Sequence, residues 1–203
     1  PETLADWLTY IERQHPQAIA MGLERVTVVR DALGLTLTFP VVTVGGTNGK
    51  GSACMLLDAI LGHAAYRVGT YTSPHLLRYN ERVRIAGKEA GDDDLVRAFV
   101  AVELARVASN VSLTYFEFGT LAAMWLFCEH EVDVAILEVG LGGRLDAVNV
   151  FDSDVALLMS IAVDHVEYLG DTREQIGAEK APIFRPGRPA ICADTDPPAS
   201  VAA

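Results

Sequence analysis

One segment constrains the fold of this chain more than any other. Residues 40–44 form a short run of Pro, Val and Thr, the glycine-rich residues 45–51 follow, and an amphipathic stretch begins at Ser52. A β-branched run that ends in glycines is typical of a buried strand entering a tight turn. Apolar residues then recur at intervals of three and four, which predicts a helix with one face packed on a sheet. Together, this strand, loop and helix predict an α/β fold.

The same alternation continues along the chain. Further candidate strands lie at residues 67–72, 132–139, 154–161 and 189–193, and helical patterns lie at residues 92–108 and 117–130. Residues 81–89 alternate in polarity across the turn Ala86-Gly87, which predicts a small hairpin after the second strand. We therefore expect a doubly wound, mostly parallel P-loop (Rossmann-like) sheet with helices on both faces.

The two ends of the chain have patterns of their own. Residues 3–12 and 17–33 are amphipathic, and a His-Pro pair interrupts them because proline disfavours helical geometry in the residue before it. We expect these stretches to form a helical preface over residues 1–36, inside one domain that spans residues 1–193. Residues 194–203 are rich in Asp, Pro, Ala and Ser, and we predict a linker there.

Composition narrows the class of ligand. Sixteen Lys and Arg against twenty-seven Asp and Glu give a formal net charge of -11, which argues against a nucleic-acid partner because phosphate backbones select basic surfaces. No apolar run has the length of a membrane span, and no secretion signal is visible. We expect a cytoplasmic monomer with small-molecule substrates, in which any anion is held locally by main-chain N–H groups.

The glycine-rich loop has the composition of a triphosphate site. Its glycines let main-chain N–H groups converge on phosphate oxygens, Lys50 adds a positive charge, and Ser52 offers a hydroxyl near the metal. The spacing departs from GxxxxGK[ST], because Val44 stands at the first glycine position and Gly51 separates the lysine from the serine. An ordinary glycine-rich turn is the alternative. The predicted ATP-binding residues are Gly46, Thr47, Asn48, Gly49, Lys50, Gly51 and Ser52.

Each predicted strand also delivers polar residues to its carboxyl end, where ligands gather in open parallel sheets. Ser73 follows the second strand, Glu138 lies inside the apolar third strand, and His165 comes after the fourth. A carboxylate in such a strand is costly to bury unless it is paired or bound to metal, and Mg²⁺ prefers oxygen ligands. Individually, Ser73 could cap a turn, Asp146 could pair with Arg144, and His165 could be a satisfied histidine. Their joint placement at one edge favours a shared site.

Longer motifs now identify a family. These motifs are GTNGKGS at residues 46–52, GLERV at 22–26, YTSPHL at 71–76, YFEFGT at 115–120, LEVGLGGRLDA at 137–147 and SIAVDH at 160–165. With them the chain resembles the folylpolyglutamate synthase/dihydrofolate synthase family of the Mur ligase superfamily, and the resemblance covers nearly the whole chain. The resemblance implies a fold of the Mur ligase central-domain type.

The resemblance also implies an activity. Family members use ATP to join L-glutamate to dihydropteroate, or to the γ-carboxylate of tetrahydrofolate, through an acyl phosphate. They carry a second, C-terminal domain that resembles a glutamate-binding half, which this sequence lacks. We therefore expect the chain to be an N-terminal ATP-binding fragment that is inactive in isolation. The rival functions are a P-loop phosphotransferase for small molecules and a non-catalytic nucleotide-binding module.

Site roles follow from matching motifs. The resemblance implies that Ser73 and Glu138 serve one Mg²⁺ and that His165 helps to hold a second. Lys180 resembles a family lysine that CO₂ carbamylates, although Pro182 replaces the usual glycine and removes a main-chain donor. Composition alone would favour a solvated lysine at a helix end. The implied catalytic residues are Lys50, Glu138, His165 and Lys180, and the implied pteroate or folate residues are Gly22, Leu23, Val26, Phe116 and Asp146.

Overall fold

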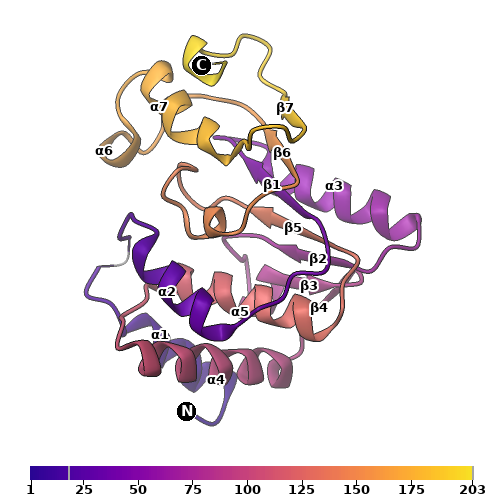
Figure 1. The fold of residues 1–203 in the computed structure, drawn as a ribbon, viewed down its shortest axis with the longest axis vertical. Helices are drawn as coiled ribbons and strands as arrows, with labels where there is room; N and C mark the ends of the chain where they lie inside the picture. The colour runs from indigo at the N-terminus through magenta and orange to yellow at the C-terminus, as the bar shows by residue number, and fades with distance from the viewer. Residues whose placement is uncertain (18, 203) are drawn as a thin grey trace.

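The computed structural model describes residues 1–17 and 19–202. Within them, seven strands form one sheet in the order β4-β3-β2-β5-β1-β6-β7 (Figure 1). The strands are β1 (Val41–Gly45), β2 (Val68–Tyr71), β3 (Val83–Ile85), β4 (Lys88–Glu89), β5 (Val134–Glu138), β6 (Val155–Leu158) and β7 (Ala190–Cys192). All neighbours from β2 to β7 run parallel, whereas β3 and β4 form the predicted antiparallel hairpin. The mostly parallel sheet expected from the sequence is confirmed.

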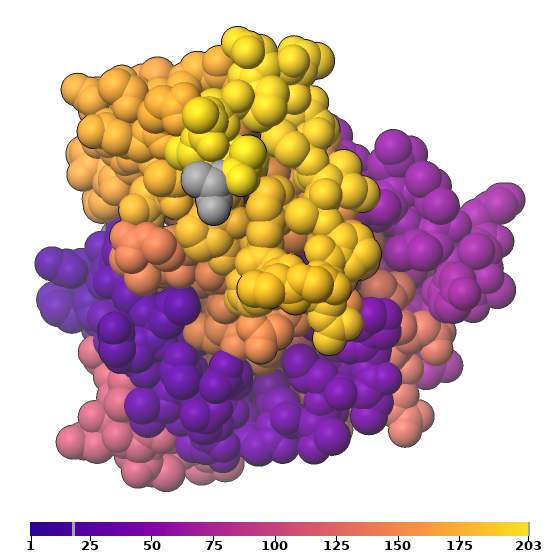
Figure 2. All heavy atoms as spheres, turned by 45° about the horizontal axis from the view of Figure 1, so that its top comes forward, coloured from indigo at the N-terminus to yellow at the C-terminus, as the bar shows by residue number. Residues whose placement is uncertain are grey.

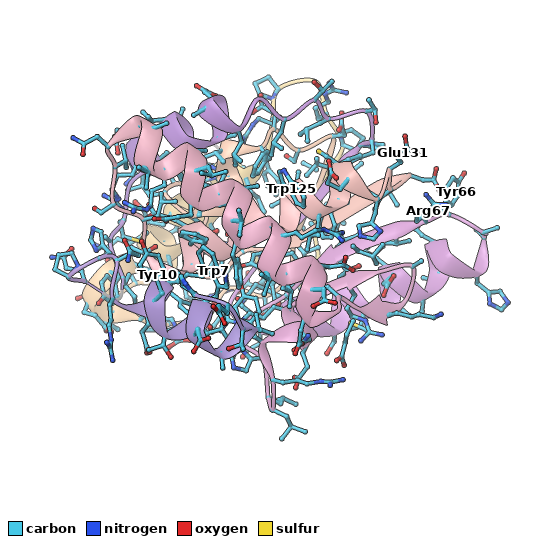
Figure 3. All side chains as sticks on the ribbon, turned by 90° about the horizontal axis from the view of Figure 1, so that it is seen from below. Trp7, Tyr10, Tyr66, Arg67, Trp125 and Glu131 are labelled. Atoms are coloured by element: carbon cyan, nitrogen blue, oxygen red, sulfur yellow. The ribbon has the colours of Figure 1, made fainter. Side chains whose placement is uncertain are left out.

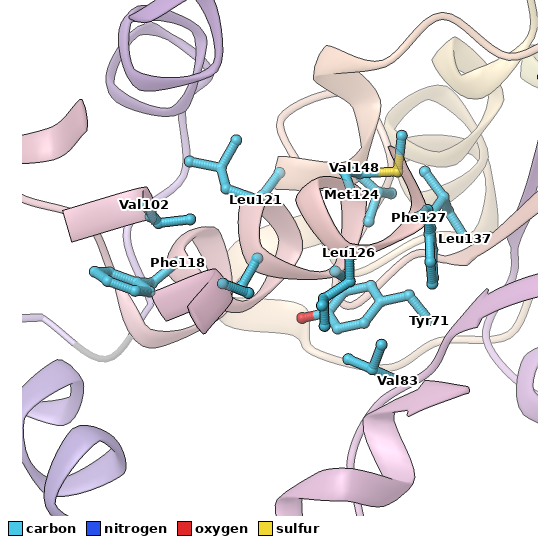
Figure 4. Close-up of a cluster of buried hydrophobic side chains, with 14 of the residues drawn as sticks. Tyr71, Val83, Val102, Phe118, Leu121, Met124, Leu126, Phe127, Leu137 and Val148 are labelled. Carbon is cyan, nitrogen blue, oxygen red and sulfur yellow. The ribbon is translucent and has the colours of Figure 1, made fainter. Parts of the chain in front are cut away.

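Helices cover both faces of this sheet. Side chains along β5 alternate, so that Val134 and Ile136 pack with residues of α3 (Lys50–His63) while Ala135 and Leu137 join the larger cluster on the other face. That larger cluster contains buried residues of α4 (Asp92–Ser109) and α5 (Tyr115–Glu129). Figure 4 shows Leu126 and Phe127 of α5 beside Tyr71 of β2.

The helical preface packs outside this layer. α1 (Leu4–Glu12) is fastened to α4, because the Tyr10 hydroxyl donates a 2.6 Å hydrogen bond to Glu103 and the ring centroid of Trp7 lies 6.1 Å from that of Phe99 (Figure 3). α2 (Glu24–Leu33) contacts both α4 and α5. The preface is therefore part of the main hydrophobic core.

One predicted helix is shorter than expected. The pattern at residues 17–33 predicts a continuous helix, but α2 begins only at Glu24, and residue 18 lies outside the described residues. Gly22 takes a positive φ of 138°, which no right-handed helix tolerates, and Arg25 donates a 2.7 Å hydrogen bond back to the Ala20 carbonyl. The described part of this stretch is therefore a shaped loop that leads into the helix.

The predicted linker also differs from expectation. In its described part, residues 194–202, the chain folds back onto α7 (Arg173–Lys180) (Figure 2). The Glu174 carboxylate accepts hydrogen bonds of 3.0 Å and 2.9 Å from the N–H groups of Ala199 and Ser200. Arg173 pairs with Asp194 at 3.2 Å. These contacts attach the segment to the domain, which composition alone could not reveal.

The contact between β2 and α5 allows a stability test. A Cβ atom on Gly69 would lie 2.6 Å from the ring of Phe127, whereas a Cβ on Gly62, in α3, would meet nothing within 4 Å. We expect Gly69→Ala to lower the free energy of unfolding by about 1–3 kcal/mol through overpacking. Gly62→Ala, the matched control, should raise it by about 0.5 kcal/mol because it stiffens a helix. Urea unfolding measures both, and equal stabilities would contradict the close approach.

Candidate functional site

The glycine-rich loop is held in a defined shape by the end of β6. The Thr47 N–H donates to the Ser160 carbonyl at 2.6 Å, and the Thr47 hydroxyl accepts from the Ala162 N–H at 3.1 Å. Gly46 has φ 133°, and a Cβ there would lie 2.9 Å from Met159. These bonds fix the loop at the N-terminus of α3, where N–H groups and the helix dipole favour an anion.

Two lysines converge on one carbonyl oxygen of this loop. Lys50 Nζ donates to the Gly46 oxygen at 3.0 Å, and Lys180 Nζ donates to the same oxygen at 3.2 Å. Lys180 is 4% exposed, and burial, followed by the charge of Lys50, lowers the pKa of Lys180 to about 8. The reading of Lys180 as a solvated helix-end lysine is therefore wrong, since α7 delivers it into the site.

Pro182 does not disturb this lysine. It lies in the first positions of a 3₁₀ turn, Ala181–Ile183, that follows directly after α7. The first residues of a helical turn need no main-chain donor, and proline's fixed φ suits them. The turn closes through a 2.9 Å bond from the Phe184 N–H to the Ala181 oxygen. The departure from the family pattern is thus accommodated locally.

Glu138 lies at the carboxyl end of β5, between the loop and the segment after β2. It is 5% exposed, and burial raises the pKa of its carboxyl group. The Ser73 N–H donates to Oε2 at 2.9 Å, and a Cβ on Gly51 would lie 3.6 Å from Oε1. Glu138 thus faces the first turn of α3, where phosphate oxygens of a nucleotide would lie.

The residues near Glu138 suit a metal ion that takes few protein ligands. Among residues 1–17 and 19–202, no group of three or more His, Cys, Asp or Glu side chains could enclose an ion. Mg²⁺ commonly takes one or two protein oxygens and completes its shell with phosphate oxygens and water. One buried carboxylate with hydroxyls nearby fits that pattern.

A cavity of about 730 Å³ adjoins this edge of the sheet. Its walls include five of the predicted site residues, namely Gly22, Ser73, Phe116, Asp146 and His165. Ser73 connects the cavity to the region of the glycine-rich loop. It lines the cavity, and its main-chain N–H donates a hydrogen bond to Glu138. The structure therefore brings the predicted residues together as two adjoining halves of one site.

Two of the predicted pocket residues lie elsewhere. Val26 is fully buried in the main core, and Leu23 is partly buried against that core; neither lines the cavity. The helical periodicity of α2 explains this, because it turns Val26 toward α4 and α5. The expectation that Val26 contacts a ligand is wrong, because its side chain is fully buried, whereas the expectation for the partly buried Leu23 stays a prediction.

Asp146 is one of three acidic residues in the cavity wall, together with Glu12 and Glu117. Its carboxylate accepts hydrogen bonds from the N–H groups of Leu141 at 2.8 Å and Val148 at 3.0 Å, and burial raises the pKa of Asp146 to about 6. The suggested pairing with Arg144 is wrong, because Arg144 forms its 2.8 Å ion pair with Glu179. Asp146 thus keeps acceptor capacity for a ligand that donates hydrogen bonds.

His165 has a different setting from the other predicted residues. It takes a positive φ of 48° immediately before the short helix α6 (Val166–Leu169), and its side chain is 50% exposed. Its Nε2 lies 3.7 Å from the Asp164 carboxylate. The backbone places this imidazole on the rim of the cavity.

Sequence reasoning overlooked Arg82. Its side chain lines the same cavity and donates from Nε to His75 Nδ1 at 2.8 Å. Its carbonyl accepts from the Thr72 N–H at 2.9 Å, which places it beside Ser73 at the carboxyl end of β2. The predicted hairpin could have pointed to Arg82. A strand that pairs antiparallel with β2 begins at the edge of the sheet where β2 ends, so the residue before that strand lies near the site.

Comparison with known proteins now gives the class. A family model of the Mur ligase middle domain matches residues 44–200. The chain therefore belongs to the Mur ligase middle-domain family, which confirms the fold and the family resemblance read from the sequence. No helix among the residues that the structure describes is long and apolar enough to cross a membrane.

Individual proteins similar to this chain narrow the comparison within the family. The chain is 52% identical over 200 residues to the dihydrofolate synthase/folylpolyglutamate synthase of Escherichia coli (strain K12), covering 98% of this chain and 47% of that protein. It superposes with TM-score 0.96 and 52% identity on E. coli FolC in complex with DHPP and ADP, over 99% of this chain and 48% of the other. A bifunctional folylpolyglutamate synthase/dihydrofolate synthase with Mn, AMPPNP and L-glutamate bound gives TM-score 0.92 and 52% identity over 99% and 48%. The chain spans about half the length of these relatives.

The buried lysine yields a prediction about pH. The folded pKa of Lys180, about 8, lies below its ordinary value of 10.5, so the unfolded chain binds more protons between these values. The free energy of unfolding should therefore rise with pH across this window, by about 3 kcal/mol relative to Lys180→Met. Unfolding in CO₂-free buffer at pH 7.5 and pH 10 measures the difference. A constant difference between the two proteins would show that the amine is not buried.

Proposed function

We propose that the chain is the ATP-binding part of a ligase that joins L-glutamate to dihydropteroate, or to the γ-carboxylate of tetrahydrofolate, through an acyl phosphate. The observation that carries the proposal is the buried Glu138 carboxylate, which faces the N-terminus of α3 and is joined through Ser73 to an aromatic-lined cavity. The names of the relatives, and the ligands bound in the related solved structures, support the same reaction.

The loop is assigned to the triphosphate of ATP. The main-chain N–H groups at the N-terminus of α3, which begins at Lys50, are assigned to the phosphate oxygens, and the Lys50 side chain balances the charge on the terminal phosphates. The Thr47 bonds to the end of β6 keep these donors oriented before the nucleotide arrives. Transfer of the γ-phosphoryl group to a carboxylate depends mainly on such positioning.

Ser73 and Glu138 are assigned to one Mg²⁺, and His165 assists a second. When bound, the metal neutralises charge on the phosphates during transfer. Glu138 is held in place for this role by the Ser73 N–H, and burial lowers the competition from water. His165 lies on the cavity rim, where its ring can reach a ligand that spans both halves of the site.

The cavity is assigned to the pteroate part of the substrate. The ring of Phe116 lies against Gly140, where a Cβ would come within 2.7 Å of it, so the wall is flat and apolar. Asp146, with a pKa of about 6, is mostly ionised at neutral pH and can accept hydrogen bonds from the amino and amide groups of a pterin. Gly22 also lines the cavity, and Leu23 and Val26, which follow it in the sequence, pack in the main core.

Lys180 is assigned to carbamylation. A pKa of about 8 leaves an appreciable fraction of neutral amine at physiological pH, and the neutral amine is the form that reacts with CO₂. The product is an anionic oxygen donor beside the loop, where Lys180 Nζ lies 3.2 Å from the Gly46 oxygen. Such a group stabilises a neighbouring cation.

Glu138→Gln tests the metal half of the site. The amide keeps the shape of the side chain but removes its charge, so we expect Mg²⁺ to stop strengthening ATP binding, with a loss of about tenfold or more in affinity. Titration calorimetry with and without Mg²⁺ gives the result, and Glu129→Gln, an exposed change at the end of α5, is the control. Retained Mg²⁺ dependence together with lower thermal stability would make Glu138 a purely structural residue.

Ligation itself is tested in a chimera. Residues 1–203 are joined to the remaining part of the E. coli relative, and ADP release is followed with dihydropteroate and L-glutamate. We expect release to require both substrates and to fall by about two orders of magnitude in the Lys50→Ala chimera. Residues 1–203 alone should form no glutamyl amide, because aminolysis must outpace hydrolysis of the acyl phosphate.

The same assay separates the rival functions. A stable phosphorylated product that forms without glutamate would favour a small-molecule phosphotransferase. A folded chimera that binds ATP and Mg²⁺ without turnover would favour a non-catalytic nucleotide-binding module.

A further inference from the structure

Arg82 stands apart from the other cations near the cavity. It is the one Lys or Arg side chain in the described cavity wall. Its neighbours Arg78 and Arg84 lie 2.7 Å and 3.8 Å from the Glu89 carboxylate. Within residues 1–17 and 19–202, no carboxylate forms an ion pair with Arg82. The wall also carries the carboxylates of Glu12, Glu117 and Asp146, and Glu117 pairs with Arg25 at 2.9 Å. Because none of the three forms an ion pair with Arg82, its guanidinium keeps the capacity to bind an anion.

The guanidinium is nevertheless held firmly. Its Nε donates to His75 Nδ1 at 2.8 Å, and its central carbon lies 5.5 Å from the ring centroid of Tyr79 and 5.4 Å from that of Tyr115. Cation–π contacts of this kind orient a guanidinium without neutralising it. His75 accepts from Nε, and the two terminal nitrogens form a planar fork whose geometry matches a carboxylate.

The position of Arg82 links both halves of the site. Its carbonyl is bonded to the Thr72 N–H, one residue before Ser73, and the Ser73 N–H is bonded to Glu138. Arg82 therefore lies where the aromatic cavity meets the edge that holds the metal and the triphosphate. An anionic group at the end of an aromatic ligand would have to pass this point to approach the γ-phosphate.

We propose that Arg82 binds the carboxylate of the acid substrate and presents it to ATP. The inference rests on the proposed function. It adds that Arg82 makes the site prefer the ionised carboxylate of that substrate over a neutral group. A carboxylate and a triphosphate repel each other, and one guanidinium beside both offsets that repulsion while its fork fixes the orientation of the carboxylate. The competing explanation is structural: Arg82 would only pack His75, Tyr79 and Tyr115 together.

The test compares an anionic ligand with a neutral one that carries one additional methyl group at this position, and the Arg82 variants separate the effect of charge from that of size. Pteroic acid and its methyl ester are titrated into the 203-residue chain without nucleotide, in the wild type, Arg82→Met and Arg82→Lys. Arg97→Met is the control, since Arg97 lies on α4 with a 59% exposed side chain and pairs with Asp94. Thermal melts establish that each variant is folded.

We expect the wild type and Arg97→Met to bind the acid about tenfold or more tightly than the ester, the ratio typical of a charged hydrogen bond. Arg82→Met should bind both ligands equally, and Arg82→Lys should give an intermediate ratio. A purely structural role would weaken acid and ester together and leave the ratio unchanged, which would overturn the proposal.

Binding of the two ligands to the wild-type chain also tests the proposal, without any variant. Equal binding of acid and ester would overturn the assignment of Arg82 and leave the proposed function intact, whether or not Arg82→Met folds. Binding of neither ligand by a chain that still binds ATP and Mg²⁺ would overturn the proposed substrate, and the assignment of Arg82 would fail with it.

Discussion

Burial of charge governs the carboxyl edge of this sheet. Glu138, Asp146 and Lys180 are each at most 5% exposed, and an ionisable group removed from water must find hydrogen-bond partners nearby. The main chain supplies them: the partners are the N–H of Ser73, the N–H groups of Leu141 and Val148, and the carbonyl of Gly46. Because main-chain partners come from rigidly placed segments, the buried charges and the loops around them hold one another in position.

These main-chain groups are available because of the sheet's topology. A parallel strand uses its own N–H and C=O groups in the ladder, while the segment that leaves its carboxyl end has groups to spare. β1, β2, β5 and β6 all end at the same edge, so four such segments meet there. The loop after β1 is bonded to the end of β6, and the segment after β2 is bonded to the end of β5.

The site has two chemically different halves. One half, around Gly46 and Lys50, offers N–H groups and positive charge to an anion. The other is an aromatic cavity whose wall carries acidic residues, Asp146 among them, and the cation Arg82, which forms no ion pair within the described residues. A ligand that suits both halves has a flat ring system with donors at one end and an anionic group at the other. Such polarity in the cavity explains why it can orient a substrate as well as bind it.

The amino-acid sequence by itself determined the strand, loop and helix at residues 41–63, the hairpin, and the acidic residue in an apolar strand, because these features depend on local periodicity and on glycine. Only the tertiary structure decided which distant residues complete the site. Lys180 meets Gly46 across 134 positions of sequence, Arg82 enters the cavity through strand pairing, and Val26 turns into the core. The docking of residues 194–202 on α7 is of the same kind. Local patterns encode periodicity, whereas burial and pairing between distant segments depend on how the elements pack, and that packing sets both the pKa of Lys180 and the charge in the cavity.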